Sequence, residues 1–467
     1  MNIPRIMIAA PGSGSGKTFL TCALLQLMKE EGRKVAAFKC GPDYIDPMFH
    51  KKIIGVPSKN LDMFFTEEEK TRALFMESAK DKEISVIEGV MGLYDGLGGI
   101  REEASSYHLA KAIEVPIVLV INGRGMGRSL LPLIAGFLRY DTEKLIVGVI
   151  LNKVTKMFYE SIKEEIEKEL SVAVLGYLPF QQELQVESRH LGLKLPEEVE
   201  NLQSRMEQAA SVLKDTLDIK RLLDLAEGAA VLSDKEDKRK EKIDRGRENS
   251  SNTEEAVPIG IAMDEAFCFY YEDNLRLLEE AGARLVPFSP LRDKRLPEGI
   301  RGLILGGGYP ELYAKELSEN GEMKADILYK LKMGMPSIAE CGGFMYLHEQ
   351  VEGEDKRMHP MVGAHQGACR NTGKLVRFGY IVINERESTF LKEDETIKGH
   401  EFHYYDSTDN GNDCIATKPI SCRNWDCVHI SDRNWWGFPH LYYASNPHYP
   451  DYFMERARAY AEEKERK

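Results

Sequence analysis

A glycine-rich loop with a lysine and a threonine lies near the start of the chain, at residues 11–18 (PGSGSGKT). Glycines let backbone N–H groups converge on phosphate oxygens, a lysine reaches the outer phosphates, and a threonine hydroxyl can ligate Mg²⁺. Pro11 replaces the usual first glycine, and a glycine turn with an incidental lysine is the alternative. However, a predicted strand (3–10) and a predicted helix (18–31) flank the loop. We therefore predict a nucleotide site at Gly14, Gly16, Lys17 and Thr18.

Acidic residues follow the next two predicted strands, at 35–40 and 84–88. The segment KCGPDYIDP ends the first strand and EGVMGLYDG ends the second. The carboxyl ends of neighbouring parallel strands lie beside a bound nucleotide, and Mg²⁺ prefers carboxylate oxygens there. For any single carboxylate the alternative is turn formation, which Gly-Pro-Asp and Tyr-Asp-Gly both favour. Taken together, the pattern predicts Mg²⁺ ligands at Thr18, Asp43, Asp46 and Glu88.

A cysteine in the second half has the setting of a nucleophile. Residues 336–347 (PSIAECGGFMYL) are typical of a strand, a sharp turn and a helix, with Cys341 on the turn. Such a turn projects the thiol from the sheet, and the helix start favours a thiolate. The N–H of Gly342 can point at a developing oxyanion, and the loop GGGYPE can supply a second donor, assigned to Gly307. A buried structural cysteine is the alternative, which we retain for Cys22, Cys40 and Cys268.

A cysteine nucleophile needs a histidine base. Spacing alone does not select one among His348, His359, His365, His400, His403, His429, His440 and His448. Three cysteines near His429 superficially resemble a metal site, namely Cys414, Cys422 and Cys427. Their gaps do not form paired CxxC motifs, so we do not expect zinc on these cysteines.

Two α/β patterns must position these groups. Apolar strands alternate with helices up to about residue 151, which indicates a parallel sheet covered on both faces. A second such pattern starts near residue 258. The intervening DKEDKRKEKIDRGRENSSNTEE has almost no apolar residues and cannot bury a core. We predict two doubly wound α/β domains, at 1–230 and 257–467, joined by a charged flexible linker at 231–256.

Composition excludes several classes of protein. The 467 residues carry a formal net charge of −13, which disfavours non-specific binding to nucleic acid or anionic membranes. The longest strongly apolar run, 115–121, is too short to cross a bilayer, and we read no signal peptide. The eight cysteines form no regular framework, which indicates a reducing, cytoplasmic setting.

Longer segments in both halves resemble one family, the cobyrinic acid a,c-diamide synthases. The segments are KCGPDYIDP, VIEGVMGLYDG, GVILNKV and RHLGL in the first half, and AMDEAFCFYYEDNL, FSPLRD, LGGGYPELYA, AECGGFMYL and GHEFHYY in the second. The resemblance covers nearly the whole chain apart from the linker. It implies an N-terminal P-loop NTPase domain similar to dethiobiotin synthetase. It also implies a C-terminal domain of the class I glutamine amidotransferase type.

The resemblance also implies roles for individual residues. It selects His440 in PHLYYASNP as the base, although Tyr442 replaces the second histidine of the common His-x-His and the preceding NWDCVHISDRNWWGF departs from the pattern. The usual His-x-Glu is absent, which leaves the group that orients the base open. Asp95 is the candidate for positioning or activating the acceptor acid, with a turn aspartate as the alternative. Asn152 and Lys153 would lie near the adenine, with an ordinary turn at the end of a strand as the alternative. Arg189 and His190 would lie near the substrate or nucleotide.

The implied reaction joins the two chemistries. ATP would activate the a and c carboxylates of cobyrinate as acyl phosphates, and glutamine hydrolysis would supply ammonia, using two ATP and two glutamine in all. The expected partners are ATP, Mg²⁺, glutamine and a corrinoid acid, without nucleic acid or membrane; a homodimer stays open. Alternative acceptors are hydrogenobyrinate, nickel-sirohydrochlorin and the substrate of cobyric acid synthase. The alternative from another class is a P-loop partner-binding ATPase with an inactive second domain.

Overall fold

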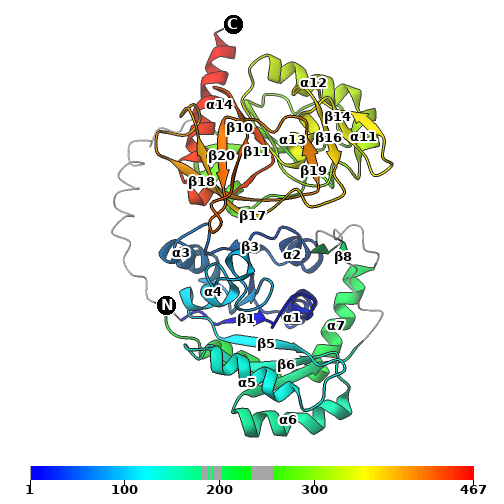
Figure 1. The fold of residues 1–467 in the computed structure, drawn as a ribbon, viewed down its shortest axis with the longest axis vertical. Coiled ribbons are helices and arrows are strands. Elements are labelled where there is room, and N and C mark those ends of the chain that lie inside the picture. Colours follow the sequence, from blue (N-terminus) through cyan, green and yellow to red (C-terminus); the bar gives the residue numbers. More distant parts are fainter. Residues whose placement is uncertain (1, 181–187, 190–191, 194–200, 233–255, 467) are drawn as a thin grey trace. The chain divides into compact units, whose positions relative to one another are not determined.

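The computed structural model describes residues 2–180, 188–189, 192–193, 201–232 and 256–466. The chain divides into two compact units, Met1–Arg247 and Glu248–Lys467 (Figure 1). The predicted linker at 231–256 falls almost entirely on residues 233–255, which lie outside the described residues. His190 lies outside them as well.

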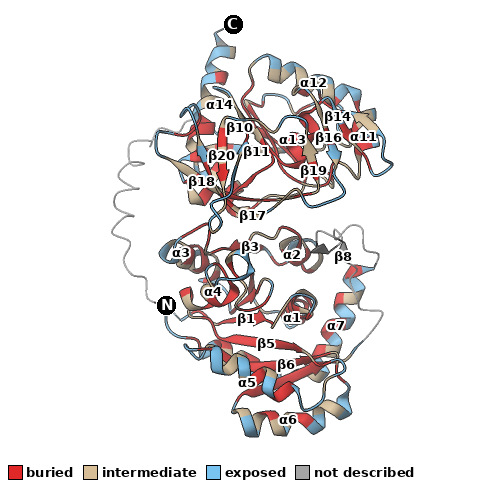
Figure 2. Cartoon of the chain, in the orientation of Figure 1, coloured by how far each residue is buried: buried red, intermediate tan, exposed pale blue. Residues whose placement is uncertain are grey.

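The N-terminal unit is built on a seven-stranded, entirely parallel sheet with the order β3-β2-β4-β1-β5-β6-β7. Strands β1, β2 and β4 match the strands predicted at 3–10, 35–40 and 84–88. Their bounds are β1 Arg5–Ala9, β2 Val35–Cys40, β3 Ser58–Leu61, β4 Ile84–Glu88, β5 Ile117–Asn122, β6 Ile146–Asn152 and β7 Ala173–Leu178. The central strands are buried along their whole length, as expected for a sheet with both faces covered (Figure 2).

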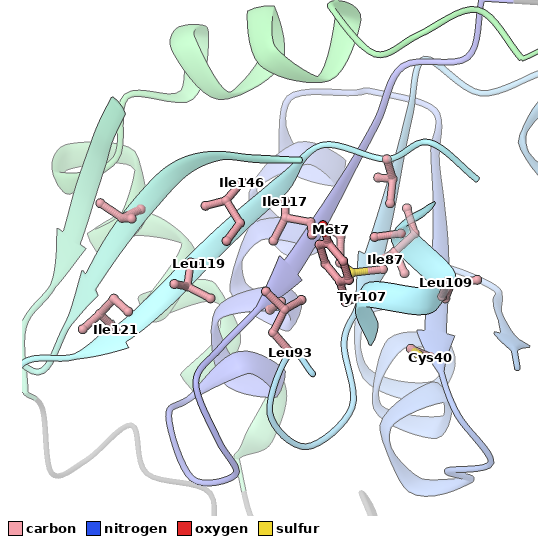
Figure 3. Packing of buried hydrophobic residues seen from close by; sticks show 14 of the residues in the cluster. Met7, Cys40, Ile87, Leu93, Tyr107, Leu109, Ile117, Leu119, Ile121 and Ile146 are labelled. Atoms are coloured by element: carbon pink, nitrogen blue, oxygen red, sulfur yellow. The ribbon is translucent and has the colours of Figure 1, made fainter. Parts of the chain in front are cut away.

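Helices cover both faces of this sheet. One face forms an apolar core that includes Met7, Ile87, Ile117 and Leu119 of the strands and Tyr107 of α4 (Figure 3). Side chains from α3, α5 and α6 complete this core, while α1, α7 and α8 pack against strands of the sheet without joining it. The bounds are α1 Lys17–Glu30, α2 Ile45–Met48, η1 Phe49–Ile54, α3 Glu68–Ala79, α4 Ser106–Ala112, α5 Leu130–Tyr140, α6 Lys156–Leu170, α7 Leu202–Thr216 and α8 Ile219–Glu227.

The C-terminal unit has a six-stranded sheet with the order β11-β10-β12-β13-β23-β22. Its strands are parallel except β22, which runs antiparallel to β23. The strands are β10 Val257–Ala262, β11 Ala283–Phe288, β12 Gly302–Leu305, β13 Ser337–Glu340, β22 His429–Ile430 and β23 Asn434–Gly437. The helices are α10 Glu272–Glu280, α11 Ala314–Glu319, α12 Gly321–Lys332, α13 Gly342–Leu347 and α14 Tyr449–Glu465. This parallel part matches the predicted α/β pattern.

Two further sheets in this unit were not predicted. A five-stranded antiparallel sheet has the order β21-β20-β17-β18-β24, and a four-stranded sheet has the order β15-β14-β16-β19. Their strands are β14 Gln350–Glu352, β15 Met358–Pro360, β16 Ala368–Asn371, β17 Arg377–Glu385, β18 Thr396–His403, β19 Tyr405–Ser407, β20 Cys414–Thr417, β21 Asn424–Cys427 and β24 His440–Leu441. Because β24 pairs with β18, residue 440 lies directly opposite residue 400.

Among the described residues, no helix combines the length and the apolar character that a membrane crossing requires.

Candidate functional site

The loop between β1 and α1 curls around the side chain of Lys17. The Lys17 ammonium donates to the carbonyl oxygens of Gly12 (3.3 Å) and Met91 (2.5 Å). Burial and the nearby charge of Lys39 lower the pKa of Lys17 to about 8. With this pKa the ammonium still carries its charge at neutral pH, and it loses the proton more readily than an exposed lysine.

Asn152 at the end of β6 supports the same loop. Its Nδ2 donates to the carbonyl of Ser15 at 2.7 Å. Gly16 has φ +95°, and a Cβ at this position would come 2.3 Å from that Nδ2. A side chain at residue 16 would therefore displace Asn152, so the structure explains why glycine is needed there. Gly14 also adopts a left-handed conformation, with φ +74°.

Thr18, Asp46 and Glu88 meet beside this loop, as the sequence predicted. The Thr18 hydroxyl donates to Oε1 of Glu88 (2.5 Å) and lies 3.3 Å from Oδ2 of Asp46. Lys39 from β2 forms ion pairs with both carboxylates, with its Nζ 2.9 Å from Oε1 of Glu88. These groups form an all-oxygen donor set whose negative charge one buried ammonium partly balances.

Burial and charge act in opposite directions in this cluster. Burial opposes ionisation of Glu88, but Lys39 and His50 outweigh it and lower the pKa of Glu88 well below its usual value. Burial, followed by the charges of Asp43 and Glu88, raises the pKa of Asp46. Burial also works against the Lys39 ammonium, yet Asp46 and Glu88 raise its pKa. The pKa values of the two carboxyls are therefore shifted in opposite directions, down for Glu88 and up for Asp46.

Sequence reasoning missed two members of the cluster, Lys39 and His50. The register of β2 on β4 places Lys39 directly opposite Glu88. The Nε2 of His50 lies 3.2 Å from Oε2 of Glu88, and its Nδ1 lies 2.9 Å from Oγ of Ser58. A lysine inside an otherwise apolar strand could have indicated a buried ion pair at Lys39. His50 belongs to no motif, so nothing in the sequence indicated its position.

Asp43 and Asp95 are engaged by the backbone. Oδ1 of Asp43 accepts from the N–H of Ile45 at 2.9 Å, and Oδ2 of Asp95 accepts from the N–H of Gly92 at 2.9 Å. These hydrogen bonds fit the turn role that was the alternative interpretation, and the roles of Asp43 as a Mg²⁺ ligand and of Asp95 at the acceptor stay predictions. Their charges still reach the site, because Asp43 raises the pKa of Asp46 and Asp95 opposes the lowering of the Lys17 pKa.

For Lys153 and Arg189, two further residues implied by the resemblance, the structure gives the backbone position. Lys153 follows β6 with φ +60°, and its N–H donates to the carbonyl of Leu178 at 2.8 Å. Arg189 lies in the short strand β8, Ser188–Arg189, which pairs with β9, Gly192–Leu193.

Cys341 lies on the predicted sharp turn, between β13 and α13. Its φ is +46°, a left-handed value that is uncommon for a residue with a side chain, and its N–H donates to the carbonyl of Gly437 at 2.8 Å. Burial raises the pKa of the thiol, although the N–H of Gly342 acts against this. The sequence had predicted that the helix start favours a thiolate. In the structure burial outweighs the short helix α13, so the resting form is a thiol.

The loop 306–308 borders both the cysteine turn and His440. A Cβ on Gly307 would come 2.3 Å from Cε1 of His440, and a Cβ on Gly342 would come 3.0 Å from the nitrogen of Gly308. The predicted oxyanion donors, the turn that carries Cys341 and the predicted base are thereby brought to one place. Backbone N–H groups at such a place can stabilise a tetrahedral intermediate.

His440 is buried, and other imidazoles lie near it. Burial, followed by the charges of His400 and His403, lowers the pKa of His440, which keeps the ring neutral. The rings of His440 and His400 are stacked with centroids 5.0 Å apart, and Nδ1 of His400 lies 3.2 Å from the hydroxyl of Tyr271. Tyr442, which replaces a second histidine, donates to Oδ2 of Asp273 at 3.2 Å. His400 was not selected from the sequence.

Glu340 precedes the cysteine and is also buried. Its carboxylate accepts from the N–H of Leu441 (3.3 Å) and from the hydroxyl of Tyr443 (3.2 Å). Burial raises the pKa of Glu340 to about 8, against the effect of these two hydrogen bonds. Glu340 thus links β13 to the segment that follows His440.

Comparison with known proteins assigns both units to described domain families. Residues 6–193 match the CobQ/CobB/MinD/ParA nucleotide binding domain, and residues 258–442 match the CobB/CobQ-like glutamine amidotransferase domain.

Several full-length relatives carry the name cobyrinate a,c-diamide synthase. One from Caldanaerobacter subterraneus subsp. tengcongensis is 40% identical over 93% of this chain and 94% of its own length. One from Listeria innocua is 37% identical over 95% of this chain and 97% of its own length. One from Thermoplasma volcanium is 35% identical over the full length of both chains.

Proposed function

The chain belongs to the cobyrinate a,c-diamide synthase family, and from this premise we propose that it amidates the a and c carboxylates of cobyrinate in cobalamin biosynthesis. It is a glutamine-dependent, amide-forming ligase. One observation carries the detailed proposal: Cys341 and His440 border the same glycine loop in a chain that also has a glycine-rich loop around Lys17. Residues 1–230 form the synthetase domain and residues 257–467 the glutaminase domain.

The synthetase domain activates the acceptor. A carboxylate oxygen of the acceptor attacks the γ-phosphorus of ATP, the bond to ADP breaks, and an acyl phosphate forms. Lys17 and the loop N–H groups hold the transferred phosphoryl group, and Asn152 maintains the shape of the loop. The oxygen donors of Thr18, Asp46 and Glu88 fit Mg²⁺, which when bound would neutralise phosphate charge. Asp95 lies close enough to affect Lys17 electrostatically and is our candidate for positioning the acceptor.

The glutaminase domain supplies ammonia. Because burial keeps Cys341 protonated, its proton must leave as the sulfur attacks the glutamine amide carbon. His440 is neutral and can accept this proton, then pass it to the departing ammonia. The N–H groups of Gly342 and Gly307 stabilise the oxyanion, and water then cleaves the thioester to release glutamate. Ammonia attacks the acyl phosphate, which releases phosphate and leaves the amide.

All eight cysteines are free, which suits a thiol enzyme in the reducing cytoplasm. This chemistry requires ATP, Mg²⁺, glutamine and the corrinoid acid, and a homodimer is compatible with it.

The test is an acceptor screen with the full-length protein. It is incubated with ATP, Mg²⁺ and glutamine, and in turn with cobyrinate, hydrogenobyrinate, nickel-sirohydrochlorin or the substrate of cobyric acid synthase, and amides are counted by mass. We expect two amides on cobyrinate, each dependent on ATP and glutamine. A product on another acceptor alone would reassign the substrate. ATP hydrolysis without any glutaminase activity would favour a P-loop partner-binding ATPase instead.

A further inference from the structure

Three side chains outside both proposed sites converge in the C-terminal unit. His365 lies in the segment between β15 and β16, Asp409 follows β19, and His429 begins β22. One ligand atom of each lies within 4.8 Å of the other two. Nε2 of His429 lies 3.5 Å from Oδ1 of Asp409 and 3.4 Å from the backbone carbonyl oxygen of Asp409.

His365 has a ring nitrogen that the protein does not satisfy. Its Nε2 is inaccessible to solvent and has no hydrogen-bond partner among the residues that the structure describes. Its ring lies 4.3 Å from that of His429, measured between centroids. A buried polar atom without a partner is uncommon in folded proteins and calls for a physical reason. Coordination of an ion by this nitrogen would provide one.

His348 lies beside this cluster, but both of its ring nitrogens have hydrogen-bond partners. Its ring lies 4.6 Å from that of His365, but Nδ1 lies 2.8 Å from the carbonyl of Phe344 and Nε2 lies 2.7 Å from Oγ of Ser407. Both of its nitrogens are engaged, so His348 supports the cluster without being available as a ligand.

We propose that His365, Asp409 and His429 form a binding site for a divalent transition-metal ion, with Zn²⁺ as the best fit. Two imidazoles and one carboxylate suit Zn²⁺, whereas Mg²⁺ and Ca²⁺ prefer oxygen ligands throughout. Ligand atoms bound to tetrahedral Zn²⁺ lie about 3.3 Å apart, close to the spacing of His429 and Asp409. Asp409 is largely exposed, so its side chain can move to close the wider separations. The fourth position takes water.

This site differs from the zinc arrangement considered for the sequence. His429 is part of it, but its partners are His365 and Asp409 instead of Cys414, Cys422 and Cys427. Its ligands lie on three separate segments of the chain, so their spacing in the sequence carries no motif.

The position of the site suggests what the ion does. Phe344 of α13, three residues beyond Cys341, packs against His365 and His429 with ring centroids 5.3 and 5.8 Å away. An ion here links three chain segments behind the helix that follows the cysteine turn. The ion therefore has a structural role: it stabilises the chain segments against which α13 packs.

The test uses the full-length protein, stripped with a chelator and titrated with Zn²⁺, and with Co²⁺ as a spectroscopic probe. The variants are His365→Gln, Asp409→Asn and His429→Gln. The control is His359→Gln, whose histidine pairs with Asp355 at 3.0 Å outside the cluster. We expect one Zn²⁺ per wild-type and control chain, a tetrahedral Co²⁺ visible spectrum, and at least about tenfold weaker binding in each ligand variant.

Stability gives a second readout that is independent of catalysis. Zn²⁺ should raise the melting temperature of the wild-type protein and of the control, and should not raise that of the ligand variants. His429 and Asp409 are partly exposed, so their variants are expected to fold even if His365→Gln does not. Equal Zn²⁺ affinity in the wild type and all folded ligand variants, or Co²⁺ binding without a tetrahedral spectrum, would overturn the proposal.

Discussion

The imidazole rings of His400 and His440 are stacked, with centroids 5.0 Å apart and planes inclined by only 17°. The two residues face each other across β18 and β24, and the Tyr271 hydroxyl lies 3.2 Å from Nδ1 of His400. The usual carboxylate partner of the base is absent from the sequence. We therefore predict that the neighbouring imidazole of His400 orients His440.

If His400 positions the base, replacing it should affect glutamine chemistry selectively. We expect His400→Ala to lower kcat of the glutamine-dependent reaction by about tenfold or more, with little change in KM for glutamine. His400→Phe keeps a flat ring against His440 and should recover part of the loss. Steady-state rates with glutamine and with ammonium chloride measure this. An equal loss with both nitrogen donors would show a general structural role instead.

The contact between Gly307 and His440 leads to a second expectation. A Cβ on residue 307 would lie 2.3 Å from the ring of His440, so Gly307→Ala must displace the base or the loop. We expect glutaminase activity to fall by at least about 100-fold, because general-base catalysis contributes on that order. Gly321→Ala is the matched control in the same unit, since nothing lies within 4 Å of the added Cβ. Normal glutaminase activity in Gly307→Ala would contradict the assignment of His440.

The lowered pKa of Lys17 predicts how ATP binding depends on pH. With a pKa of about 8 in the free protein, the protonated fraction of Lys17 falls as pH rises through that value. Phosphate binding favours the charged form, so Kd for ATP should be nearly constant below about pH 7 and should rise up to about tenfold per unit above pH 8. Calorimetry across this range measures it. Lys17→Arg stays charged and should lose this dependence; an unchanged slope in that variant would exclude Lys17 as its source.

The raised pKa of Glu340 predicts a loss of stability at higher pH. The folded state binds a proton at this carboxyl up to about pH 8, whereas the ordinary value is 4.5, so the folded state holds more protons between these values. The free energy of unfolding therefore decreases as pH rises through this window, by at most about 1.4 kcal/mol per pH unit. Glu340→Gln cannot ionise and should show a shallower fall.

Tryptophan fluorescence can follow this effect, because Trp425, Trp435 and Trp436 all lie in the unit that contains Glu340. Denaturant unfolding near pH 5.5 and near pH 7.5 then compares the wild type with Glu340→Gln, and with the exposed Glu322→Gln as control. If the free energy of unfolding of both variants decreases between these pH values as steeply as that of the wild type, the proton on Glu340 is not the cause.

The local sequence was sufficient to predict a site where that site lies within one strand, one turn and one helix. The phosphate loop at Lys17 and the cysteine turn at Cys341 each have this form, and the parallel α/β architecture around them is confirmed. Thr18, Asp46 and Glu88 could be grouped because strand ends in a parallel sheet share one edge.

Contacts that depend on pairing between distant segments could not be predicted in this way. His50 reaches Glu88 across 38 residues of sequence, and no motif marks it. The antiparallel sheets that place His400 against His440 were not predicted, so the neighbour of the base was missed as well. The cluster of His365, Asp409 and His429 depends on the same unpredicted part of the unit.

The most direct test of the central claim follows the nitrogen atom. Wild-type protein is given ATP, Mg²⁺, cobyrinate and glutamine labelled with nitrogen-15 at the amide, in the presence of unlabelled ammonium, and the product is analysed by mass. We predict two labelled amides for the wild type, and only unlabelled amides for Cys341→Ser, which retains the synthetase reaction. Mainly unlabelled product from the wild type, or labelled product from Cys341→Ser, would contradict the claim that a glutaminase at Cys341 feeds the ATP-dependent amidation.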